Sequence, residues 1–393
     1  MVDIGRNGAL STGVSDLFQL LRDGQPRTRA ELAGITGLGR STVASRVDAL
    51  MSLGLVSAVG EATSTGGRPS SRFALNPSAR VVLAVDIGAS HAQIAITDLV
   101  GTELATSSAA IDIAQGPLVV LGWVVEATRA VLDDLGRDHG DLIGIGIGVP
   151  GPVEHSTGRP INPPIMPGWD RFEVARWVES QLGARTLVDN DVNIMALGER
   201  AHAWPAVDHL LFIKVATGIG SGIISDGRLQ RGAEGIAGDI GHVRIARAAD
   251  VPCRCGNRGC LEAIASGPAI ARQLRERGVE VEDGRGVLEL VRAGNVDAIQ
   301  AVRQAGRDIG EVLTAAVSFI NPSVIALGGS MAQAGEHLIV GVREVIYSRS
   351  MPLATEHLTI APSAAGSRAA VIGASVLAIE HALAPENLAR VTG

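Results

Sequence analysis

Four apolar segments of this chain run directly into loops rich in glycine, and this pattern restricts the fold more than any other feature of the sequence. These segments are residues 81–99, 143–153, 209–224 and 324–331. A fifth apolar stretch passes into a helical pattern at Asp189, Asn190 and Asp191. Short apolar runs that end in tight turns are typical of buried strands, and strands alternating with helices build α/β lobes. The sequence therefore predicts an α/β fold whose ligands bind at the strand ends.

The glycine loops also suggest a class of ligand. Glycine at a strand end allows backbone N–H groups to approach a phosphate closely. Tight turns require glycine for their backbone geometry as well, so each loop taken alone has a purely structural explanation. The ordered set of loops, and not any single one, favours a nucleotide-binding or sugar-binding architecture.

Length and composition exclude several classes of protein. A chain of 393 residues is longer than one ordinary domain and can bury a large core. A content of 46% hydrophobic and 19% charged residues is that of a globular protein. No apolar run reaches about 18 residues, and the first residues lack the layout of a signal peptide. We therefore expect a cytoplasmic protein with no membrane partner.

The first 80 residues differ in charge from the rest. They carry nine Arg against six Asp and Glu, a net charge of +3, whereas the whole chain carries −7. Thr28 and Glu31 have the spacing of a capping box at the start of a helix. A second helical pattern follows the turn at 37–39 and places Val43, Val47 and Leu50 on one apolar side. The remaining pattern, 56–75, reads as two strands joined by a polar tip.

This arrangement predicts a winged helix-turn-helix over residues 1–75, with a junction near 76–80 and a second domain over 76–393. Small hydroxyl side chains and arginine opposite the apolar face suit a helix that lies in the major groove of DNA. The Gly-Gly-Arg-Pro tip of the wing suits a minor groove. The expected DNA contacts are Arg40, Ser41, Thr42, Ser45, Arg46 and Arg68. The alternative is a small helical interaction module that contacts no DNA.

All three cysteines of the chain lie within eight positions, at Cys253, Cys255 and Cys260. Clustered thiols in a reducing compartment indicate a metal more than a disulfide. The CxCGxxGC spacing lets the thiolates surround one tetrahedral ion, with glycine allowing the tight backbone. Three unmetallated thiols or an iron–sulfur cluster are the alternatives. A zinc site needs a fourth ligand, and His242 lies eleven residues before Cys253.

Three motifs together carry a family resemblance. They are DNDVNIMALGE, ATGIGSGII..G.L..G..G.AGDIGH and CRCGNRGCLEAIASG, which begin at Asp189, Ala216 and Cys253. In these residues the chain resembles the ROK family (repressors, open reading frames and sugar kinases) from about residue 81 onward. With the winged helix in front, it resembles the transcriptional regulators of that family. The resemblance implies a two-lobed actin-like, RNase H-like sugar-kinase fold.

The resemblance also implies the site residues. It makes His242, Cys253, Cys255 and Cys260 the ligands of a closed, structural zinc site. It assigns sugar contacts to Asn190, Asp191, Asp239, His242 and Glu262. The sequence departs from the family's ExGH motif because Asp239 is one methylene shorter than glutamate, which bears on which sugar binds.

In the kinases of the family, the residue that matches Asp191 is the general base of phosphoryl transfer. The matching ATP residues here are Asp86, Gly88, Thr217, Gly218, Gly220, Gly328 and Gly329. The first phosphate loop departs from the DxGGTK pattern of those kinases, with Ala89 and His91 in place of glycine and lysine. Ala216 also stands where a glycine is usual. We therefore expect a vestigial ATP site and no requirement for ATP or Mg²⁺.

These observations favour a sugar-responsive transcriptional repressor of carbohydrate-metabolism genes. Its expected partners are operator DNA, a sugar effector and further copies of the chain, as a homodimer or homotetramer. An ATP-dependent hexose or amino-sugar kinase with an appended DNA-binding head is the alternative. A regulator controlled by a partner protein is a third interpretation.

Overall fold

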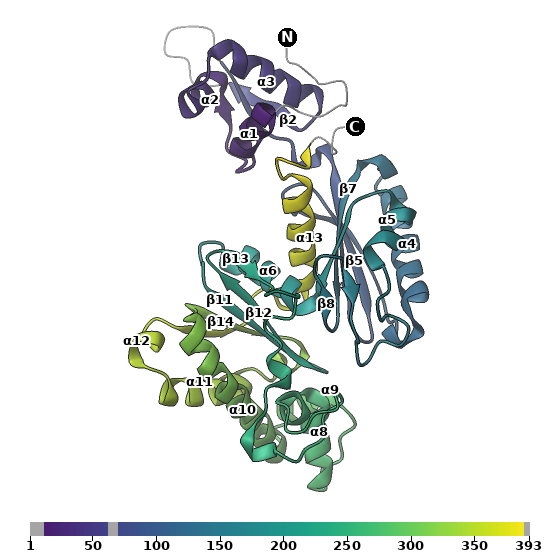
Figure 1. Cartoon of the computed structure of the whole chain (residues 1–393), viewed down its shortest axis with the longest axis vertical. Helices are drawn as coiled ribbons and strands as arrows, with labels where there is room; N and C mark the ends of the chain where they lie inside the picture. Colours follow the sequence, from purple (N-terminus) through teal and green to yellow (C-terminus); the bar gives the residue numbers. More distant parts are fainter. Residues whose placement is uncertain (1–11, 62–69, 389–393) are drawn as a thin grey trace.

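The computed structural model describes residues 12–61 and 70–388, so the expected DNA contact of Arg68 lies outside the described residues. Figure 1 shows a small N-terminal unit, which we call the head, above two larger lobes. Each lobe is built on a five-stranded sheet. Among the described residues, no helix has both the length and the apolar character needed to cross a membrane.

The head contains three helices and a three-stranded antiparallel sheet of order β1-β3-β2. Its elements are α1 (Thr12–Leu21), β1 (Arg27–Thr28), α2 (Arg29–Thr36), α3 (Arg40–Ser52), β2 (Val56–Glu61) and β3 (Ser71–Leu75). The predicted capping box is confirmed: Thr28 Oγ1 accepts from the Glu31 amide at 3.2 Å, and the Glu31 carboxylate accepts from the Thr28 amide at 2.7 Å. The predicted apolar face of α3 is confirmed as well, because Val43, Val47 and Leu50 are fully buried.

The first lobe has the sheet order β10-β7-β4-β5-β6. Its strands are β4 (Val81–Ile87), β5 (Ala92–Thr97), β6 (Glu103–Ala109), β7 (Leu142–Val149) and β10 (Thr186–Asn190). β4, β7 and β10 run parallel to one another, whereas β5 pairs antiparallel with both of its neighbours, β4 and β6. α4 (Pro117–Asp134) and α5 (Val174–Leu182) cover one face, and α13 (Ala369–Ala382) covers the other (Figure 1). A small hairpin, β8 (Val153–Glu154) and β9 (Arg159–Pro160), follows β7.

The second lobe has the sheet order β13-β12-β11-β14-β15. Its strands are β11 (Leu210–Val215), β12 (Ile219–Ser225), β13 (Arg228–Gln230), β14 (Val324–Gly328) and β15 (Thr359–Pro362). Its helices are α7 (Glu262–Ala265), α8 (Gly267–Glu276), α9 (Gly284–Arg292), α10 (Val296–Ile320), α11 (Glu336–Arg349) and α12 (Pro352–Thr355). α10 ends where Asn321 adopts a left-handed conformation, directly before Pro322.

Two helices connect the lobes and pack against each other. α6 (Asp191–Ala203) leads from β10 to β11, and α13 leads from β15 back to the sheet of the first lobe. A Cβ on Gly198 would lie 1.9 Å from the Ala369 carbonyl oxygen, and one on Gly373 would lie 1.8 Å from that of Ile194. Only glycine allows two helix backbones to approach this closely. The two connections therefore form one tightly packed pair.

The fully buried Glu199 carboxylate reinforces this pair. It accepts hydrogen bonds from the Ala364 amide at 2.9 Å and from the Ala365 amide at 3.1 Å, in the loop that precedes α13. The indole N–H of Trp204 donates to it from the end of α6 at 3.2 Å. A buried carboxylate is tolerated only when such bonds replace its hydration. Glu199 therefore joins the end of one interlobe connection to the start of the other.

The head packs on the far end of α13, beside the first lobe (Figure 1). Gln19 donates from its side-chain amide to the Leu383 carbonyl at 2.8 Å. One buried apolar cluster contains both head residues and residues at the end of α13, among them Leu17, Phe18, Ile379, Ala382 and Leu383. α13 therefore contacts the head, the first lobe and α6.

Candidate functional site

A cavity of about 500 Å³ lies between the lobes, and we call it the interlobe pocket. It is bordered by the loop after β7, the start of α6, the β11–β12 turn and the cysteine loop. The structure brings all five residues expected to contact sugar to its wall: Asn190, Asp191, Asp239, His242 and Glu262. Lys214 and Arg254 also line it, although the sequence patterns assigned them no role.

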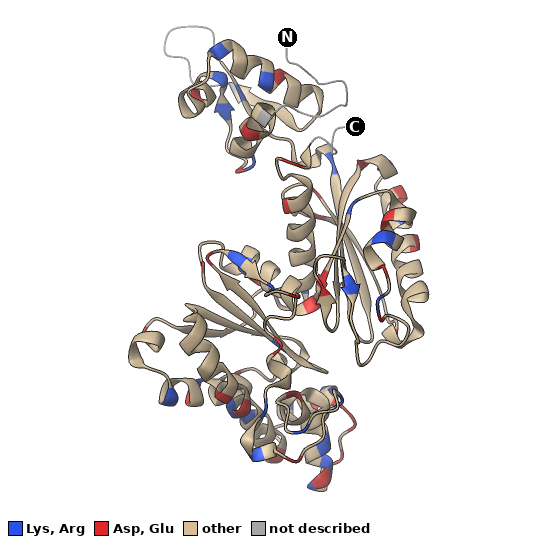
Figure 2. Cartoon of the chain, in the orientation of Figure 1, with Lys and Arg blue, Asp and Glu red and all other residues tan. Residues whose placement is uncertain are grey.

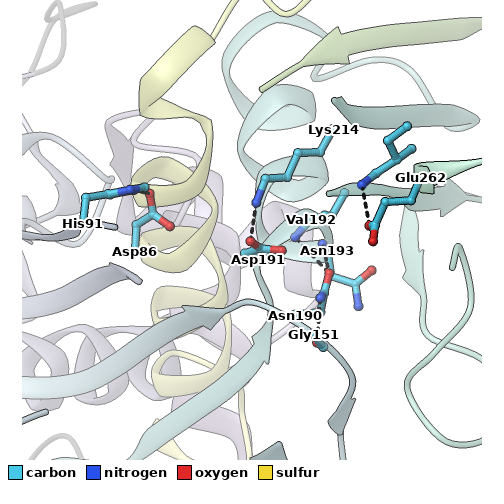
Figure 3. Close-up of polar contacts among 10 residues, drawn as sticks. Asp86, His91, Gly151, Asn190, Asp191, Val192, Asn193, Lys214 and Glu262 are labelled. Atoms are coloured by element: carbon cyan, nitrogen blue, oxygen red, sulfur yellow. Dashed lines mark hydrogen bonds and ion pairs between the residues drawn. The ribbon is translucent and has the colours of Figure 1, made fainter. Parts of the chain in front are cut away.

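Asn190 is largely committed to the protein itself. Its Oδ1 accepts from the amides of Val192 at 2.9 Å and Asn193 at 3.4 Å, which caps the N-terminus of α6. Its Nδ2 donates to the Gly151 carbonyl at 2.8 Å (Figure 3). An amide nitrogen carries two hydrogens, so one N–H stays available to a ligand. Asn190 thus holds α6 in place and offers a single donor to the pocket.

Asp191, the first residue of α6, forms an ion pair with Lys214 of β11 (Figure 3). Burial alone would lower the pKa of Lys214, but attraction to Asp191, and then to Asp86, outweighs it and raises this pKa above the usual range. Lys214 therefore stays charged, and its ammonium contacts the Asp191 carboxylate at the start of α6.

The neighbouring Asp189 serves the framework of the site. It is almost fully buried and accepts from the Asn190 amide and the Asn193 side chain, both at 2.8 Å. Arg231 Nε donates to its other oxygen at 2.6 Å. These bonds fix the turn from β10 into α6.

The glycine loop Thr217–Gly222 is shaped by packing. The Glu262 carboxylate accepts from the Ile219 amide at 3.1 Å, and a Cβ on Gly218 would lie 2.7 Å from Glu262 Oε2. A Cβ on Gly222 would lie 2.7 Å from the Val192 carbonyl oxygen. These contacts explain Gly218 and Gly222 by packing, without any bound phosphate. Thr217, at the start of the loop, is exposed.

The other expected ATP residues have contacts of the same kind. His91 Nε2 lies 3.2 Å from Asp86 Oδ2, and its ring covers the position that a Cβ on Gly88 would occupy. The Phe212 ring fills the Cβ position of Gly328, while Gly329 has a φ of 83° and packs on Val215. Neither Asp86 nor His91 lines the interlobe pocket.

The four expected metal ligands lie together, with their ligand atoms all within 4.8 Å of one another. Cys255 Sγ lies 3.7 Å from Cys260 Sγ, and Cys253 Sγ lies 3.8 Å from His242 Nδ1. In a tetrahedral site with Zn–S bonds of about 2.3 Å, neighbouring ligand atoms lie about 3.8 Å apart. One nitrogen and three sulfurs at this spacing could hold a metal ion.

The metal-ligand loop borders the interlobe pocket, since His242 and Cys255 belong to both. Its backbone is pinned by hydrogen bonds such as Cys253 N–H to Asn257 O at 2.9 Å. Arg247, which lies between His242 and Cys253, forms a bidentate ion pair with the buried Asp308 of α10. The loop is thus anchored to the second lobe independently of any metal.

On the head, the expected DNA contacts differ in exposure. Arg40, Ser41 and Thr42 are exposed at the start of α3, whereas Ser45 and Arg46 are half-buried. The Arg46 guanidinium packs on Gly13 of α1, where a Cβ would lie 2.1 Å from Nη2. Basic and acidic residues are interspersed over the head (Figure 2). The exposed set is therefore confined to the first turn of α3.

A sequence model described as the ROK family matches residues 82–381. The chain belongs to the ROK family. The two-lobed body of this ROK chain carries the match, and the head precedes it. The family predicted from the three motifs is confirmed.

Relatives of this ROK chain include regulators of the same length. The xylose repressor of Bacillus spizizenii (strain ATCC 23059 / NRRL B-14472 / W23) is 28% identical over 371 residues, which cover 93% of this chain and 94% of the relative. A crystal structure of a ROK family transcriptional regulator, a homologue of the E. coli MLC protein, has a TM-score of 0.82 at 24% identity. The match covers 97% of this chain and 99% of the regulator's chain, so the shared fold includes the head.

Kinases of the family resemble the body alone. The ROK family glucokinase from Streptomyces griseus, solved in complex with glucose and AMPPNP, has a TM-score of 0.64 at 27% identity. It covers 76% of this chain and 99% of its own length. The predicted two-lobed sugar-kinase fold with an additional N-terminal domain is therefore confirmed.

Proposed function

We propose that this ROK protein is a sugar-responsive, DNA-binding transcriptional regulator that acts as a repressor. The observation that carries the proposal is the similarity to a xylose repressor along 93% of the chain, head included. The sugar kinases match the body without the head. We take residues 1–75 as the DNA-binding domain and 76–393 as the sugar-binding domain.

The effector in this proposal is an uncharged monosaccharide in the interlobe pocket. Asp191, Asp239 and Glu262 offer carboxylate oxygens, and Asn190 and Lys214 offer N–H groups. Sugar hydroxyls both donate and accept hydrogen bonds, so such a mixed wall suits them. The cavity volume of about 500 Å³ is within the range of small-molecule sites.

We infer that a structural zinc ion supports this pocket, held by His242, Cys253, Cys255 and Cys260. Four protein ligands leave no open position, so zinc would supply cross-linking and no Lewis-acid chemistry. A metal on His242 Nδ1 would leave Nε2 of the same ring available to the pocket. Zinc would thereby set the orientation of one wall of the sugar site.

The proposed signal runs along the interlobe helices. Sugar bound at Asn190 and Asp191 would stabilise one angle between the lobes, and α6 would transmit that angle to α13 through the contacts of Gly198 and Gly373. The head would follow because it packs on the end of α13. In this proposal the lobes have one arrangement that binds DNA and another that does not. Sugar changes the affinity for DNA only to the extent that it binds these two arrangements with different affinity.

The DNA contacts in this proposal come from the first turn of α3. Arg40, Ser41 and Thr42 are exposed there and fit the expected approach of a recognition helix to base edges. Two heads in a homodimer, or four in a homotetramer, would read half-sites at a fixed separation. A small rotation of each head would then lower operator affinity.

A selection from random DNA duplexes, followed by titration with sugars, tests the function. The selected duplex should bind the full chain, and one member of a panel of pentoses, hexoses and amino sugars should weaken that binding at least about tenfold. D-xylose leads the panel because of the relative's name. Failure to select any sequence would overturn the DNA-binding proposal, and indifference to every sugar would overturn the sensor.

A further inference from the structure

We propose that Lys214 contacts the sugar directly, and that with Asp191 it holds one sugar hydroxyl while preventing Asp191 from acting as a general base. This inference rests on the proposed sugar-binding function. It assigns a role to the only lysine in the chain. Asp191 is the first residue of α6, and Lys214 lies near the end of β11, the strand that follows α6.

The geometry directs both side chains of the pair to the ligand. Lys214 and Asp191 both line the interlobe pocket, with side-chain exposures of 22% and 6%. Among the described residues, each is the other's only side-chain hydrogen-bond partner. The second oxygen of Asp191 and two N–H groups of Lys214 are therefore left for a bound molecule.

A hydroxyl group matches what the pair leaves open. It can donate to the free carboxylate oxygen and accept from the ammonium, so one hydroxyl satisfies both partners. Hydrogen bonds that involve an ionised group are stronger than bonds between neutral groups. The pair is electrically neutral overall, so binding an uncharged sugar leaves no net charge buried. Loss of the ammonium, in contrast, would leave the Asp191 carboxylate buried without a partner.

The same pair opposes phosphoryl transfer. A general base must take a proton from the attacking hydroxyl. Transfer of that proton to Asp191 would neutralise the carboxylate and cost its ion pair with Lys214, which opposes the step. Asp86, the other carboxylate that matches the kinases, is occupied by His91 at 3.2 Å. Both carboxylates that a kinase would use thus have a cationic or hydrogen-bonding partner from this chain. The pocket is suited to hold a hydroxyl without deprotonating it.

Titrations of sugars and deoxy sugars into the parent and into a variant test the contact between Lys214 and the sugar. D-xylose, D-glucose and their monodeoxy derivatives would be titrated calorimetrically into the full chain and into Lys214→Met, which keeps the apolar stem. We expect the variant to bind the responsive sugar at least about tenfold more weakly. One deoxy derivative should bind the two proteins equally, because its missing hydroxyl is the one that Lys214 holds. Lys214→Arg should recover part of the affinity because it restores a cationic donor.

Arg343→Met is the matched control. Arg343 pairs with Glu336 at 3.1 Å on the surface of the second lobe and does not line the pocket, so this variant should bind as the parent does. Equal sugar affinity of Lys214→Met and the parent would overturn the inference alone. Absence of binding by the parent to every sugar of the pentose, hexose and amino-sugar panel would overturn it together with the proposed effector class.

A measurement on the parent chain covers the case in which Lys214→Met does not fold. Reductive methylation followed by mass spectrometry reports on Lys214 without a competing lysine. We expect bound sugar to slow its methylation at least about fivefold. An unchanged rate at saturating sugar, or ADP formed from Mg-ATP only when sugar is present, would overturn the inference.

Discussion

Arg22 of α1 and Glu380 of α13 form an ion pair, with Nη2 and Oε1 2.8 Å apart. Gln19 donates to the Leu383 carbonyl one turn further along α13. Both polar contacts belong to the interface through which the head meets the helix that connects the lobes. They join the head, which carries the proposed DNA contacts, to α13, although 364 residues separate Gln19 from Leu383.

Removing these contacts should uncouple sugar from DNA. In Gln19→Ala/Arg22→Ala we expect sugar affinity within about twofold of the parent, because neither residue lines the interlobe pocket. The sugar-induced loss of DNA affinity should shrink about threefold or more, since each exposed contact contributes about 1 kcal/mol or less. Fluorescence anisotropy measures the ratio of the DNA affinities without and with sugar. Arg303→Ala, which removes an ion pair within the second lobe, is the control, and an unaltered ratio in the double variant would refute the coupling route.

The cysteine loop should contain about one zinc ion per chain. Cys255→Ser is expected to lower the zinc content well below one and to weaken sugar binding, because Cys255 and His242 border the pocket. Arg258→Ala in the same loop removes no ligand and should retain the metal. Elemental analysis and calorimetry give the two readouts. A folded parent chain that is free of metal after purification without chelators would contradict the site.

Filling the contact between α6 and α13 should be destabilising. Gly198→Ala and Gly373→Ala each force a methyl against a backbone carbonyl, and we expect losses of about 1–3 kcal/mol in the free energy of unfolding. Gly122→Ala in α4 meets no atom within 4 Å and should instead stabilise the chain by about 0.5–1 kcal/mol. Urea unfolding measures all three variants. Equal effects at the three glycines would show that the close approach is not required.

Two arginines of α3 should respond differently to truncation. Arg40 is exposed, so Arg40→Ala should weaken DNA binding by about 1–3 kcal/mol and leave the melting temperature unchanged. Arg46 packs on Gly13, so Arg46→Ala should lower the melting temperature as well. Thermal unfolding and anisotropy separate the two effects. If Arg46→Ala keeps full thermal stability but loses DNA binding, its guanidinium leaves Gly13 and contacts DNA.

The pair of Asp86 and His91 should make stability depend on pH. The hydrogen bond that His91 donates to the Asp86 carboxylate raises the pKa of His91 above its usual value, and burial opposes this effect more weakly. The resulting stabilisation is complete below the unfolded-state pKa of about 6.5 and is lost as the pH rises through the higher folded-state value. The gap in unfolding free energy between the parent and His91→Asn should therefore narrow as the pH rises. Urea unfolding of both proteins at a series of pH values measures this gap, and a gap that stays constant with pH would contradict the prediction.

Much of the fold was predictable because its signals are local. Apolar runs that end in glycine loops, the capping box of Thr28 and Glu31 and the stop at Asn321-Pro322 each depend on neighbouring residues. The close spacing of the cysteines likewise indicated a metal-ligand set, which the structure brings together with His242.

The contacts between lobes could not be predicted in this way. Lys214 meets Asp191 across 23 residues, and its single occurrence in the sequence was the one available signal. The loop glycines suggested phosphate, whereas Gly222 is explained by its approach to Val192 of α6. Each of these contacts depends on how the lobes and their connecting helices pack, and residue spacing along one segment does not encode that packing.

The position of α13 in the chain has a consequence for biosynthesis. The head is translated before the body, yet the apolar surface that joins the two includes Ile379, Ala382 and Leu383, which leave the ribosome more than 300 residues later. Domains usually fold in the order of their synthesis. Here a nascent chain would carry its head without the support of α13 until more than 300 further residues have been added. A transcript truncated before α13 would encode a head that no sugar could control.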